Sequence, residues 1–279
     1  MSRPPAALVL VATPIGNLGD LSPRAIEELA GADVVVCEDS RRTGKLLELA
    51  GVRARGLLVA NDHNEARRVD EVLDRLARGE RVAVVSDAGL PGISDPGERL
   101  VRAAAEAGHR VEVVPGPSAA MAALVASGLP AGRFVMEGFL PRKGSGRTER
   151  LAEVAAERRT VVLYEAPHRV ARTLADLAGA CGPERRVVIA RELTKLHEEI
   201  WRGTLGEAVE RVAHLEPRGE HVLVLAGASA PAAAGDEEIL AALAVERDGG
   251  ASTRDAVATV ASALAVPRRR VYDLATGVG

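Results

Sequence analysis

The chain has 279 residues, of which 47% are hydrophobic and 2% aromatic, and its formal net charge is −3. This length suggests one large or two medium domains, and the charge excludes a protein that attracts nucleic acid through a global positive field. The scarcity of aromatic residues also excludes a broad stacking platform for single-stranded nucleic acid. Any contact with a polyanion must therefore come from a local patch.

The chain shows no sign of membrane or secretory targeting. No apolar run approaches the about 18 residues of a membrane span, and no apolar segment of a signal peptide opens the sequence. The two cysteines, Cys37 and Cys181, form no CxxC pair, which fits a reducing, cytoplasmic setting. We find no metal-ligand spacing and expect no bound metal.

Short apolar strands alternate with amphipathic helices in the first half of the chain. Strands are expected at residues 6–12, 34–37, 57–59, 82–85 and 111–114. Continuous apolar runs of this kind are typical of parallel strands that are buried on both faces. The pattern predicts an α/β domain with a mostly parallel sheet, ending near residue 117 at Pro115-Gly116-Pro117. Ser22 and Ser118 are predicted to cap the helices that follow them.

Two loops at predicted strand ends are candidate ligand sites. The loop at 13–20 lacks the GxGxxG motif that cradles a pyrophosphate, so a ligand bound there needs no phosphate. The loop that starts at Ser86-Asp87 contains three glycines and two prolines, and Asp87 can accept hydrogen bonds from hydroxyl or ammonium groups. The alternative in each case is a rigid turn without a ligand. Asp95 is predicted to cap the next helix, with Pro96 at its first position.

A second set of strands follows in the second half. These strands are expected at residues 133–138, 160–164, 186–190, 199–202 and 221–225, with 199–202 at an edge and 221–225 closing the sheet. Residues 141–150 carry four cations against one anion, and their glycines predict a flexible, phosphate-binding segment. A solvated loop is the alternative.

The C-terminal part is predicted to be helical. An Ala/Pro/Gly/Ser-rich linker at 229–235 precedes helices near 236–247, 253–264 and 267–276, in a helix-turn-helix-like unit. Residues 236–279 hold five arginines and seven acidic residues, so this unit is expected to be an accessory rather than an autonomous nucleic-acid binder. Packing or dimer contact is the alternative role. The expected domains are thus 1–117, 118–228 and 236–279.

Short motifs at the strand ends follow one another in a specific order between residues 8 and 225. They are Thr13-Pro14-Ile15-Gly16-Asn17-Leu18, Glu38-Asp39-Ser40-Arg41, Asp62-His63-Asn64-Glu65, Ser86-Asp87-Ala88-Gly89, Asp95-Pro96-Gly97, Pro115-Gly116-Pro117, Glu137-Gly138-Phe139-Leu140-Pro141, Tyr164-Glu165, His168-Arg169 and Arg191-Glu192-Leu193-Thr194-Lys195. Each motif alone is weak, but the ordered set resembles the tetrapyrrole methylase superfamily, and within it the small-subunit ribosomal RNA methyltransferase I group. The chain departs from the pattern at Ser40, where Thr is usual, and at Leu90, which separates Gly89 from Pro91.

The resemblance implies two α/β/α domains that bind S-adenosylmethionine in the cleft between them. The implied reaction is 2′-O-methylation of a cytidine in the decoding region of 16S rRNA, within the small ribosomal subunit, by a cytoplasmic homodimer. S-adenosylmethionine has no phosphate, which agrees with the missing pyrophosphate loop. Two alternatives remain open: a tetrapyrrole methyltransferase that acts on a corrinoid precursor, and a non-enzymatic ribosome-binding factor.

The same resemblance implies roles for individual residues. Contacts with the methyl donor are expected for Pro14, Ile15, Gly16, Ser86, Asp87, Leu90, Ser118, Ala119, Tyr164 and Leu193. Candidates for a general base or for orienting the ribose hydroxyl are His63, Glu165, Glu192 and Lys195, and the sequence does not choose among them. Contacts with RNA are expected for Arg41, Arg42, Arg142, Lys143, Arg147 and Arg169.

Overall fold

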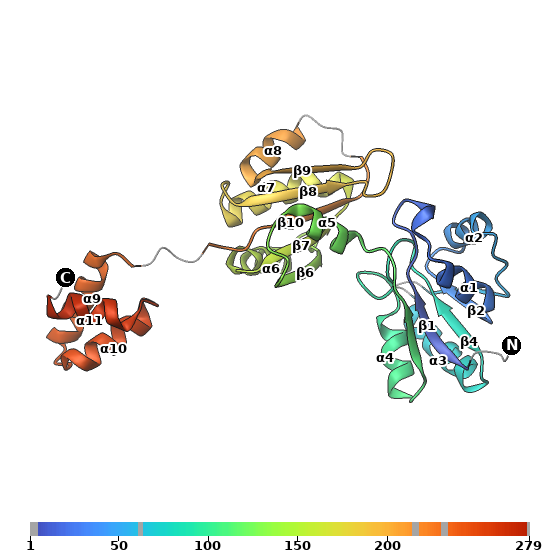
Figure 1. Cartoon of the computed structure of the whole chain (residues 1–279), viewed down its shortest axis with the longest axis horizontal. Helices are drawn as coiled ribbons and strands as arrows, with labels where there is room; N and C mark the ends of the chain where they lie inside the picture. Colours follow the sequence, from blue (N-terminus) through green and yellow to red (C-terminus); the bar gives the residue numbers. More distant parts are fainter. Residues whose placement is uncertain (1–4, 61–63, 214–217, 230–233, 278–279) are drawn as a thin grey trace. The chain divides into compact units, whose positions relative to one another are not determined.

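The computed structural model describes residues 5–60, 64–213, 218–229 and 234–277 and divides into two compact units, Met1–Ala228 and Ser229–Gly279 (Figure 1). The first unit contains two five-stranded sheets, and the second contains helices. The predicted fold class, two α/β parts with a C-terminal helical unit, is therefore confirmed. No helix in the described part of the chain is long and apolar enough to cross a membrane.

The first sheet is entirely parallel, as predicted, with strand order β3-β2-β4-β1-β5. Its strands are β1 (Ala7–Val11), β2 (Val34–Cys37), β3 (Leu57–Val59), β4 (Arg81–Val84) and β5 (Val111–Val114). Alternate residues of β1 enter two different cores. Val9 and Val11 pack in one core with residues of α1 (Pro23–Gly31) and α2 (Ser40–Leu49). Leu8 packs in the other with residues of α3 (Glu65–Ala77) and α4 (Glu98–Glu106), so helices cover both faces of the sheet.

The start of α4 differs from the prediction. Ser22 caps α1 as expected, since its hydroxyl accepts from the Ala25 N–H. Helix α4, however, begins at Glu98 with Gly97 at the N-cap, so the prediction that Asp95 caps this helix is wrong. The cap comes from elsewhere in the chain. The buried carboxylate of Glu65, on α3, accepts from the N–H of Gly97 at 2.9 Å. A cap from another helix leaves no local sequence signal.

The second sheet is mixed and has the order β6-β7-β10-β8-β9. Its strands are β6 (Phe134–Phe139), β7 (Thr160–Glu165), β8 (Arg186–Arg191), β9 (Glu199–Thr204) and β10 (His221–Leu225). The β6–β7 pair is parallel, and the pairs that involve β10 and β9 are antiparallel. The prediction that β9 is an edge strand is confirmed. The prediction that β10 closes the sheet is wrong, because β10 lies in its centre, where all five of its residues are buried.

Helices cover both faces of the second sheet as well. One face packs against α5 (Ala119–Ser127). The other packs against α6 (Ser145–Ala156), α7 (Val170–Cys181) and α8 (Leu205–Ala213). Two short 3₁₀ helices, η1 (Leu18–Asp20) and η2 (Pro167–Arg169), follow β1 and β7. The basic segment at 141–150 is not a continuous loop as expected, since α6 begins at Ser145.

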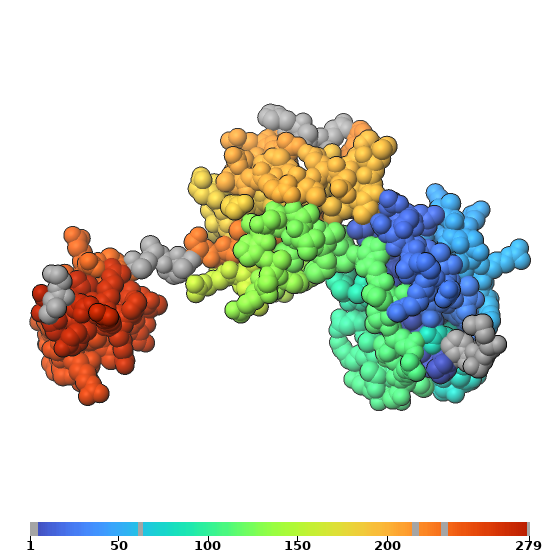
Figure 2. All heavy atoms as spheres, viewed as in Figure 1, coloured from blue at the N-terminus to red at the C-terminus, as the bar shows by residue number. Residues whose placement is uncertain are grey.

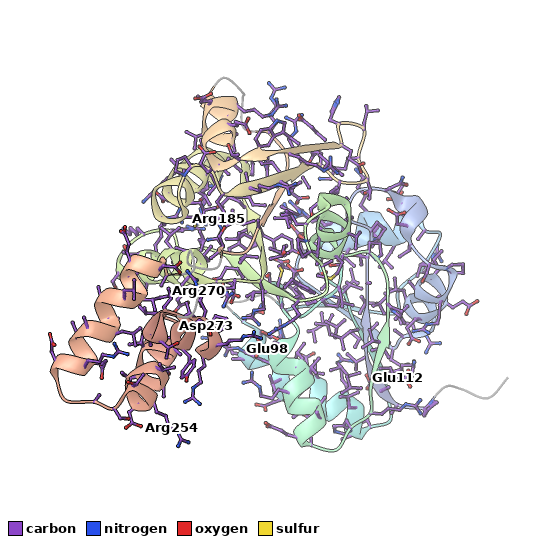
Figure 3. All side chains as sticks on the ribbon, turned by 60° about the vertical axis from the view of Figure 1, so that its left-hand side comes forward. Glu98, Glu112, Arg185, Arg254, Arg270 and Asp273 are labelled. Carbon is purple, nitrogen blue, oxygen red and sulfur yellow. The ribbon has the colours of Figure 1, made fainter. Side chains whose placement is uncertain are left out.

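The second compact unit is a three-helix cluster, in agreement with the prediction for residues 236–279. It consists of α9 (Asp236–Asp248), α10 (Thr253–Ala263) and α11 (Arg268–Thr276), packed around Ile239, Val260 and Val271. Arg270 on α11 pairs with Asp236 at the start of α9 at 2.6 Å. Arg254, Arg270 and Asp273 mark this unit in Figure 3.

A buried arginine fastens the amino-terminal ends of the first sheet. Arg81, 6% exposed, lies at the start of β4. Its guanidinium bonds both carboxylate oxygens of Glu28 on α1 and the carboxylate of Glu112 on β5, which is labelled in Figure 3. Hydrogen bonding to Arg81 is the largest cause that lowers the pKa of Glu112. This network joins one helix and two strands at the end of the sheet opposite to the strand-end loops.

We expect Arg81→Met to lower the free energy of unfolding by about 3 kcal/mol at neutral pH, because it leaves the partly buried carboxylate of Glu28 unpaired and leaves Glu112 with Arg110 alone. Since the pKa of Glu112 is lowered in the folded state, its stabilising effect is present above its ordinary value of 4.5 and is lost as the pH falls through the lowered pKa. The difference between Arg81→Met and wild type in urea denaturation should therefore shrink in acid. Arg78→Met, at a more exposed arginine of the same turn, is the control. An equal loss from both variants would contradict this account.

Candidate functional site

A cavity of about 440 Å³ lies among the loops at the carboxyl ends of the first sheet and the facing end of the second sheet. This volume is within the range of cofactor and substrate pockets. Its lining comes from the loops after β1, β2 and β4, from α2 and the start of α5, and from β6, β7, β8 and β10 with their loops. In the space-filling view, the blue atoms of the N-terminal residues adjoin the yellow-to-orange atoms of the second sheet (Figure 2).

Two loops of the first sheet are tied together beside this cavity. The Thr13 N–H donates to the Gly89 carbonyl at 2.8 Å and the Gly89 N–H donates back to the Thr13 carbonyl at 3.1 Å. The buried hydroxyl of Thr13 also donates to the Ser86 carbonyl. Gly89 has φ +86°, and a Cβ at this position would meet Ile15 and the Pro117 carbonyl at 3.5 Å. This position therefore favours glycine on conformational grounds.

Asp87 projects its carboxylate from these tied loops into the cavity lining. One oxygen, Oδ2, lies 3.2 Å from Nη1 of Arg42 on α2. The other, Oδ1, is buried and has no hydrogen-bond partner among the described residues. Burial raises the pKa of Asp87, although the charge of Arg42 opposes this shift. A buried acceptor without a partner costs free energy that a bound donor group would recover.

The second sheet supplies a wall that is partly aromatic. Tyr164 of β7 is half-buried, and its ring centroid lies 5.6 Å from that of Phe139, which is 52% exposed. Burial raises the pKa of the Tyr164 hydroxyl. Ser118 stands at the N-cap position of α5 as predicted, but its side chain makes no capping hydrogen bond. Ser118, Ala119 and Tyr164 all line the cavity.

A strained turn after β8 completes the wall with Leu193. The residues on either side, Glu192 and Thr194, have φ values of +51° and +66°, which are uncommon for residues with side chains. Lys195 at the end of this turn pairs with Glu192 at 2.8 Å and with Glu220 at 3.0 Å. A Cβ on Gly16 would lie 2.4 Å from the Lys195 side chain, so the absence of a side chain there lets the two loops meet.

The cavity lining is acidic. Among the described residues that line it, one arginine, Arg42, stands against five carboxylates, Glu38, Asp87, Asp95, Glu165 and Glu220. Such a lining favours a ligand with cationic or hydroxyl groups and disfavours a phosphate-bearing one. The described residues contain no group of three or more His, Cys, Asp or Glu placed to hold a metal ion.

Seven of the ten residues predicted to contact the methyl donor line this one cavity. They are Ile15, Asp87, Leu90, Ser118, Ala119, Tyr164 and Leu193. The other three lie beside it. The buried hydroxyl of Ser86 donates a hydrogen bond to the Gly89 carbonyl, so Ser86 has a structural role in this turn. Gly16 meets the Lys195 turn, and Pro14 precedes Ile15 in the same loop.

Glu165, a predicted catalytic candidate, lines the cavity but already has several partners. Its carboxylate, 2% exposed, accepts from the Thr173 hydroxyl at 2.6 Å and from the Ala166 N–H at 2.9 Å. Arg169 lies 3.1 Å from it. These contacts engage both carboxylate oxygens and hold the side chain in place, which favours a structural role for Glu165. His63, another candidate, lies outside the described residues.

Glu192 and Lys195 form an ion pair that bears on their predicted roles. A hydrogen bond from Lys195 is the main cause that lowers the pKa of Glu192. Burial acts to lower the pKa of Lys195, but hydrogen bonds to Glu192 and Glu220 outweigh it, so the pKa is raised. The hypothesis that Lys195 has a lowered pKa and acts as a base is therefore not supported. Lys195 is an ammonium group that can donate hydrogen bonds.

The residues predicted to contact RNA differ widely in exposure. Arg142 and Lys143 are exposed and make no ion pair within the described part of the chain. Arg41 is also exposed and pairs with its neighbour Asp39. Arg42 lines the cavity, where it pairs with Asp87.

Arg147 and Arg169 have structural partners instead. Arg147 is 4% exposed, and its guanidinium bonds Asp176, Thr173 and the Pro141 carbonyl. Arg169 is mostly buried between Glu165 and the Leu140 carbonyl. The structure gives no support for an RNA contact by either residue, because their donors are already used within the protein.

Several cavity residues were not predicted. They include Ile93, Ser94, Asp95, Pro167, Glu220 and His221. Asp95 belongs to a motif of the resemblance, in the loop after β4, so that signal could have found it. Glu220 and His221 reach the cavity because β10 lies in the centre of the sheet, and no pattern in the sequence reveals that placement.

Comparison with known proteins shows the family of this chain. Residues 7–209 match the family model for Tetrapyrrole (Corrin/Porphyrin) Methylases. The chain is 45% identical over 269 residues to the "Ribosomal RNA small subunit methyltransferase I" of Synechocystis sp., with 96% of each chain covered. It is 51% identical to the protein of the same name from Xylella fastidiosa, over 81% of this chain and 83% of that one.

Solved structures share the fold. The methyltransferase CobJ matches with a TM-score of 0.59 at 24% identity, over 82% of this chain and 96% of its own. Uroporphyrin-III C-methyl transferase from Thermus thermophilus, in complex with S-adenyl homocysteine, matches with a TM-score of 0.56 at 21% identity, over 79% of this chain and 96% of its own. Given the family match over most of the first unit and the identity to curated relatives along nearly the whole chain, the chain belongs to the tetrapyrrole methylase family and, within it, to the ribosomal RNA small subunit methyltransferase I group.

Proposed function

We propose that this protein transfers a methyl group from S-adenosylmethionine to the 2′-oxygen of a cytidine ribose in the decoding region of 16S rRNA, within the small ribosomal subunit. Relatives named as ribosomal RNA small subunit methyltransferases support the enzyme class and the substrate. The single observation that carries the proposal within this chain is the unpaired Oδ1 of Asp87 in an acidic cavity of about 440 Å³.

The residues present fit S-adenosylmethionine. The ligand offers an ammonium group and ribose hydroxyls as hydrogen-bond donors, and Asp87 Oδ1 is a buried acceptor that needs one. The acidic lining suits the cationic sulfonium. Ile15, Leu90, Ala119 and Leu193 offer apolar contacts. When bound, the ligand supplies an activated methyl group on sulfur.

The chain's own residues then align the reacting groups, which is the main task when the methyl group is already activated. Asp87 holds the donor, and Arg42 fixes the Asp87 carboxylate through Oδ2. Lys195, held by Glu192 and Glu220, presents an ammonium group beside the cavity and orients the ribose hydroxyl or its neighbouring phosphate. Glu165, held by Thr173 and Arg169, keeps the loop after β7 in place.

RNA contact is assigned to the exposed cations outside the cavity. Arg142 and Lys143 precede α6 and are the best candidates, with Arg41 at the start of α2. We also infer a cytoplasmic homodimer. The 39% exposed Met121 and the 74% exposed Val125 give α5 an apolar outer surface of the kind that subunit contacts cover. Sedimentation of the full chain as a monomer would contradict the dimer. Relatives named as ribosomal RNA methyltransferases favour an RNA substrate over a corrinoid one and an enzyme over a non-enzymatic factor.

Incubation of the protein with labelled S-adenosylmethionine and unmethylated 30S subunits tests the proposal directly. Mapping should place the label on a cytidine ribose of 16S rRNA. Asp87→Asn should raise the dissociation constant for S-adenosylmethionine in calorimetry by about 10- to 100-fold, because it weakens a charge-assisted hydrogen bond. Asp70→Asn, at an exposed residue of α3, is the matched control. Unchanged affinity in Asp87→Asn would show that the cavity has been misassigned.

The raised pKa of Lys195 makes a prediction about pH. A group with a raised pKa stays protonated up to and beyond its ordinary value of 10.5, so wild-type activity should not rise as the pH approaches that value. Lys195→Met should lower kcat/KM by about 10- to 100-fold and Lys195→Arg should retain most of the activity, since arginine stays charged. Activity that climbs with pH and is lost equally in both variants would instead identify Lys195 as a base.

Charge reversal tests the RNA surface. Arg142→Glu combined with Lys143→Glu should weaken 30S binding and reduce the dependence of log affinity on log salt by about 0.7 for each lost phosphate contact. The control is Arg53→Glu combined with Arg67→Glu, which makes the same change of charge at two exposed residues of the part of the chain that forms the first sheet. If filter binding at several salt concentrations gives the same slope for both double variants, Arg142 and Lys143 do not contact RNA.

A further inference from the structure

Four ionisable residues lie side by side across the second sheet. Backbone pairing places Glu165 opposite His221, His221 opposite Arg191, and Arg191 opposite Glu199. Directly opposed residues of antiparallel strands project from the same face of a sheet. The row therefore runs across β7, β10, β8 and β9, at the end of the sheet that borders the large cavity. The members of this row carry charge or hydrogen-bonding groups, whereas the rest of the same face of the sheet packs in an apolar core.

A second, smaller cavity of about 80 Å³ opens over this row, and we refer to it as the side pocket. Its lining includes Pro167, His168, Arg191, Trp201 and His221. Pro167 and His221 also line the large cavity, so the two spaces adjoin at these residues. Arg191 pairs with Glu199 at 2.9 Å, and Glu199 also binds Arg211, which stacks over the Trp201 ring at 5.7 Å.

The side pocket contains two buried polar atoms that lack partners among the described residues. They are Nδ1 of His221, a residue that is 8% exposed, and Nε of Arg191. An arginine Nε is only a donor, whereas a histidine nitrogen can donate or accept. Burial is the main cause that lowers the pKa of His221, and a hydrogen bond to the Gly219 backbone opposes this shift. Both atoms belong to directly opposed residues, so one ligand edge can reach both.

We propose that the side pocket receives the Watson–Crick edge of the target cytosine, with Arg191 Nε–H donating to N3 and His221 Nδ1 accepting from the N4 amino group. This inference rests on the proposed function, because the ribose must then lie at the junction with the large cavity, where the methyl donor binds. On that edge cytosine has an acceptor, N3, next to a donor, the N4 amino group. Uracil reverses both groups, with a hydrogen on N3 and an oxygen at position 4, so the donor of Arg191 and the acceptor of His221 together discriminate between the two bases. The small volume suits the edge of one pyrimidine and not a whole nucleotide.

Variants separate these contacts from the fold. Arg191→Lys keeps the charge that pairs with Glu199 but removes the Nε donor, and His221→Phe keeps the ring but removes the nitrogens. Each should lower kcat/KM on unmethylated 30S subunits by about 10- to 100-fold. Arg191→Lys, at a residue that lines only the side pocket, should leave the affinity for S-adenosylmethionine unchanged. Controls are Arg186→Lys, at the exposed start of the same strand, and His109→Phe, in the first sheet's half. Loss of S-adenosylmethionine binding in both pocket variants would overturn the proposal.

Base selectivity gives a readout that a purely structural role would not change. Wild type should methylate 30S subunits with cytidine at the target far faster than subunits reconstituted with uridine there. In His221→Phe this ratio should fall by about tenfold or more. An unchanged ratio, or wild-type kcat/KM in both pocket variants, shows that the side pocket holds only water.

A binding measurement distinguishes failure of this inference from failure of the proposed function. Cytidine 5′-monophosphate, added to the protein with S-adenosylhomocysteine, should shift the ¹⁵N resonance of His221 Nδ1, and uridine 5′-monophosphate should not. If this selective shift appears but no rRNA is methylated, the side pocket stands and the proposed reaction fails. If rRNA is methylated but neither nucleotide shifts His221, the reaction stands and the side pocket is overturned.

Discussion

The unpaired carboxylate oxygen of Asp87 is the constraint on which the site depends. A buried acceptor without a partner costs about 1–3 kcal/mol, and the free protein bears this cost because the surrounding loops leave the side chain no alternative. The mutual hydrogen bonds of Thr13 and Gly89 fix the backbone. Arg42 holds the other oxygen. The cavity is thus organised before any ligand enters, and a ligand with a suitable donor recovers the cost.

On the opposite wall of the cavity, ion pairs and a hydrogen bond hold the turn after β8 in place. Positive φ angles at Glu192 and Thr194 cost about 1–3 kcal/mol each. The ion pairs of Lys195 with Glu192 and Glu220, and the 2.6 Å hydrogen bond from the Thr194 N–H to Glu198, offset that cost. Because Gly16 has no side chain, the turn approaches the loop after β1 closely. Glycine at this position is therefore needed for the approach of two loops rather than for a special φ angle.

Much of the architecture could be predicted from local patterns. Sequence patterns located all ten strands of the described residues to within about two residues, and the loop motifs indicated the family. The failures share a physical cause. The central place of β10 depends on its pairing with β7 and β8. The cap of α4 comes from Glu65 on another helix. The guanidinium of Arg147 donates its hydrogen bonds to Asp176 and Thr173 within the protein. Each is a contact between distant parts of the chain, which the periodicity of one segment cannot reveal. The same holds for His221, whose importance arises only from its neighbours across the sheet.

The position of β10 also has a consequence for biosynthesis. Every strand of the first sheet has been made once residue 114 has been translated, so that half can assemble while the remainder of the chain is still being synthesised. The second sheet cannot, because β7 and β8 are hydrogen-bonded to β10 rather than to each other. Until residue 225 leaves the ribosomal tunnel, both strands expose an unpaired apolar edge. A nascent chain truncated before β10 should therefore be a substrate for chaperones, even though it already contains most of the residues of the cavity.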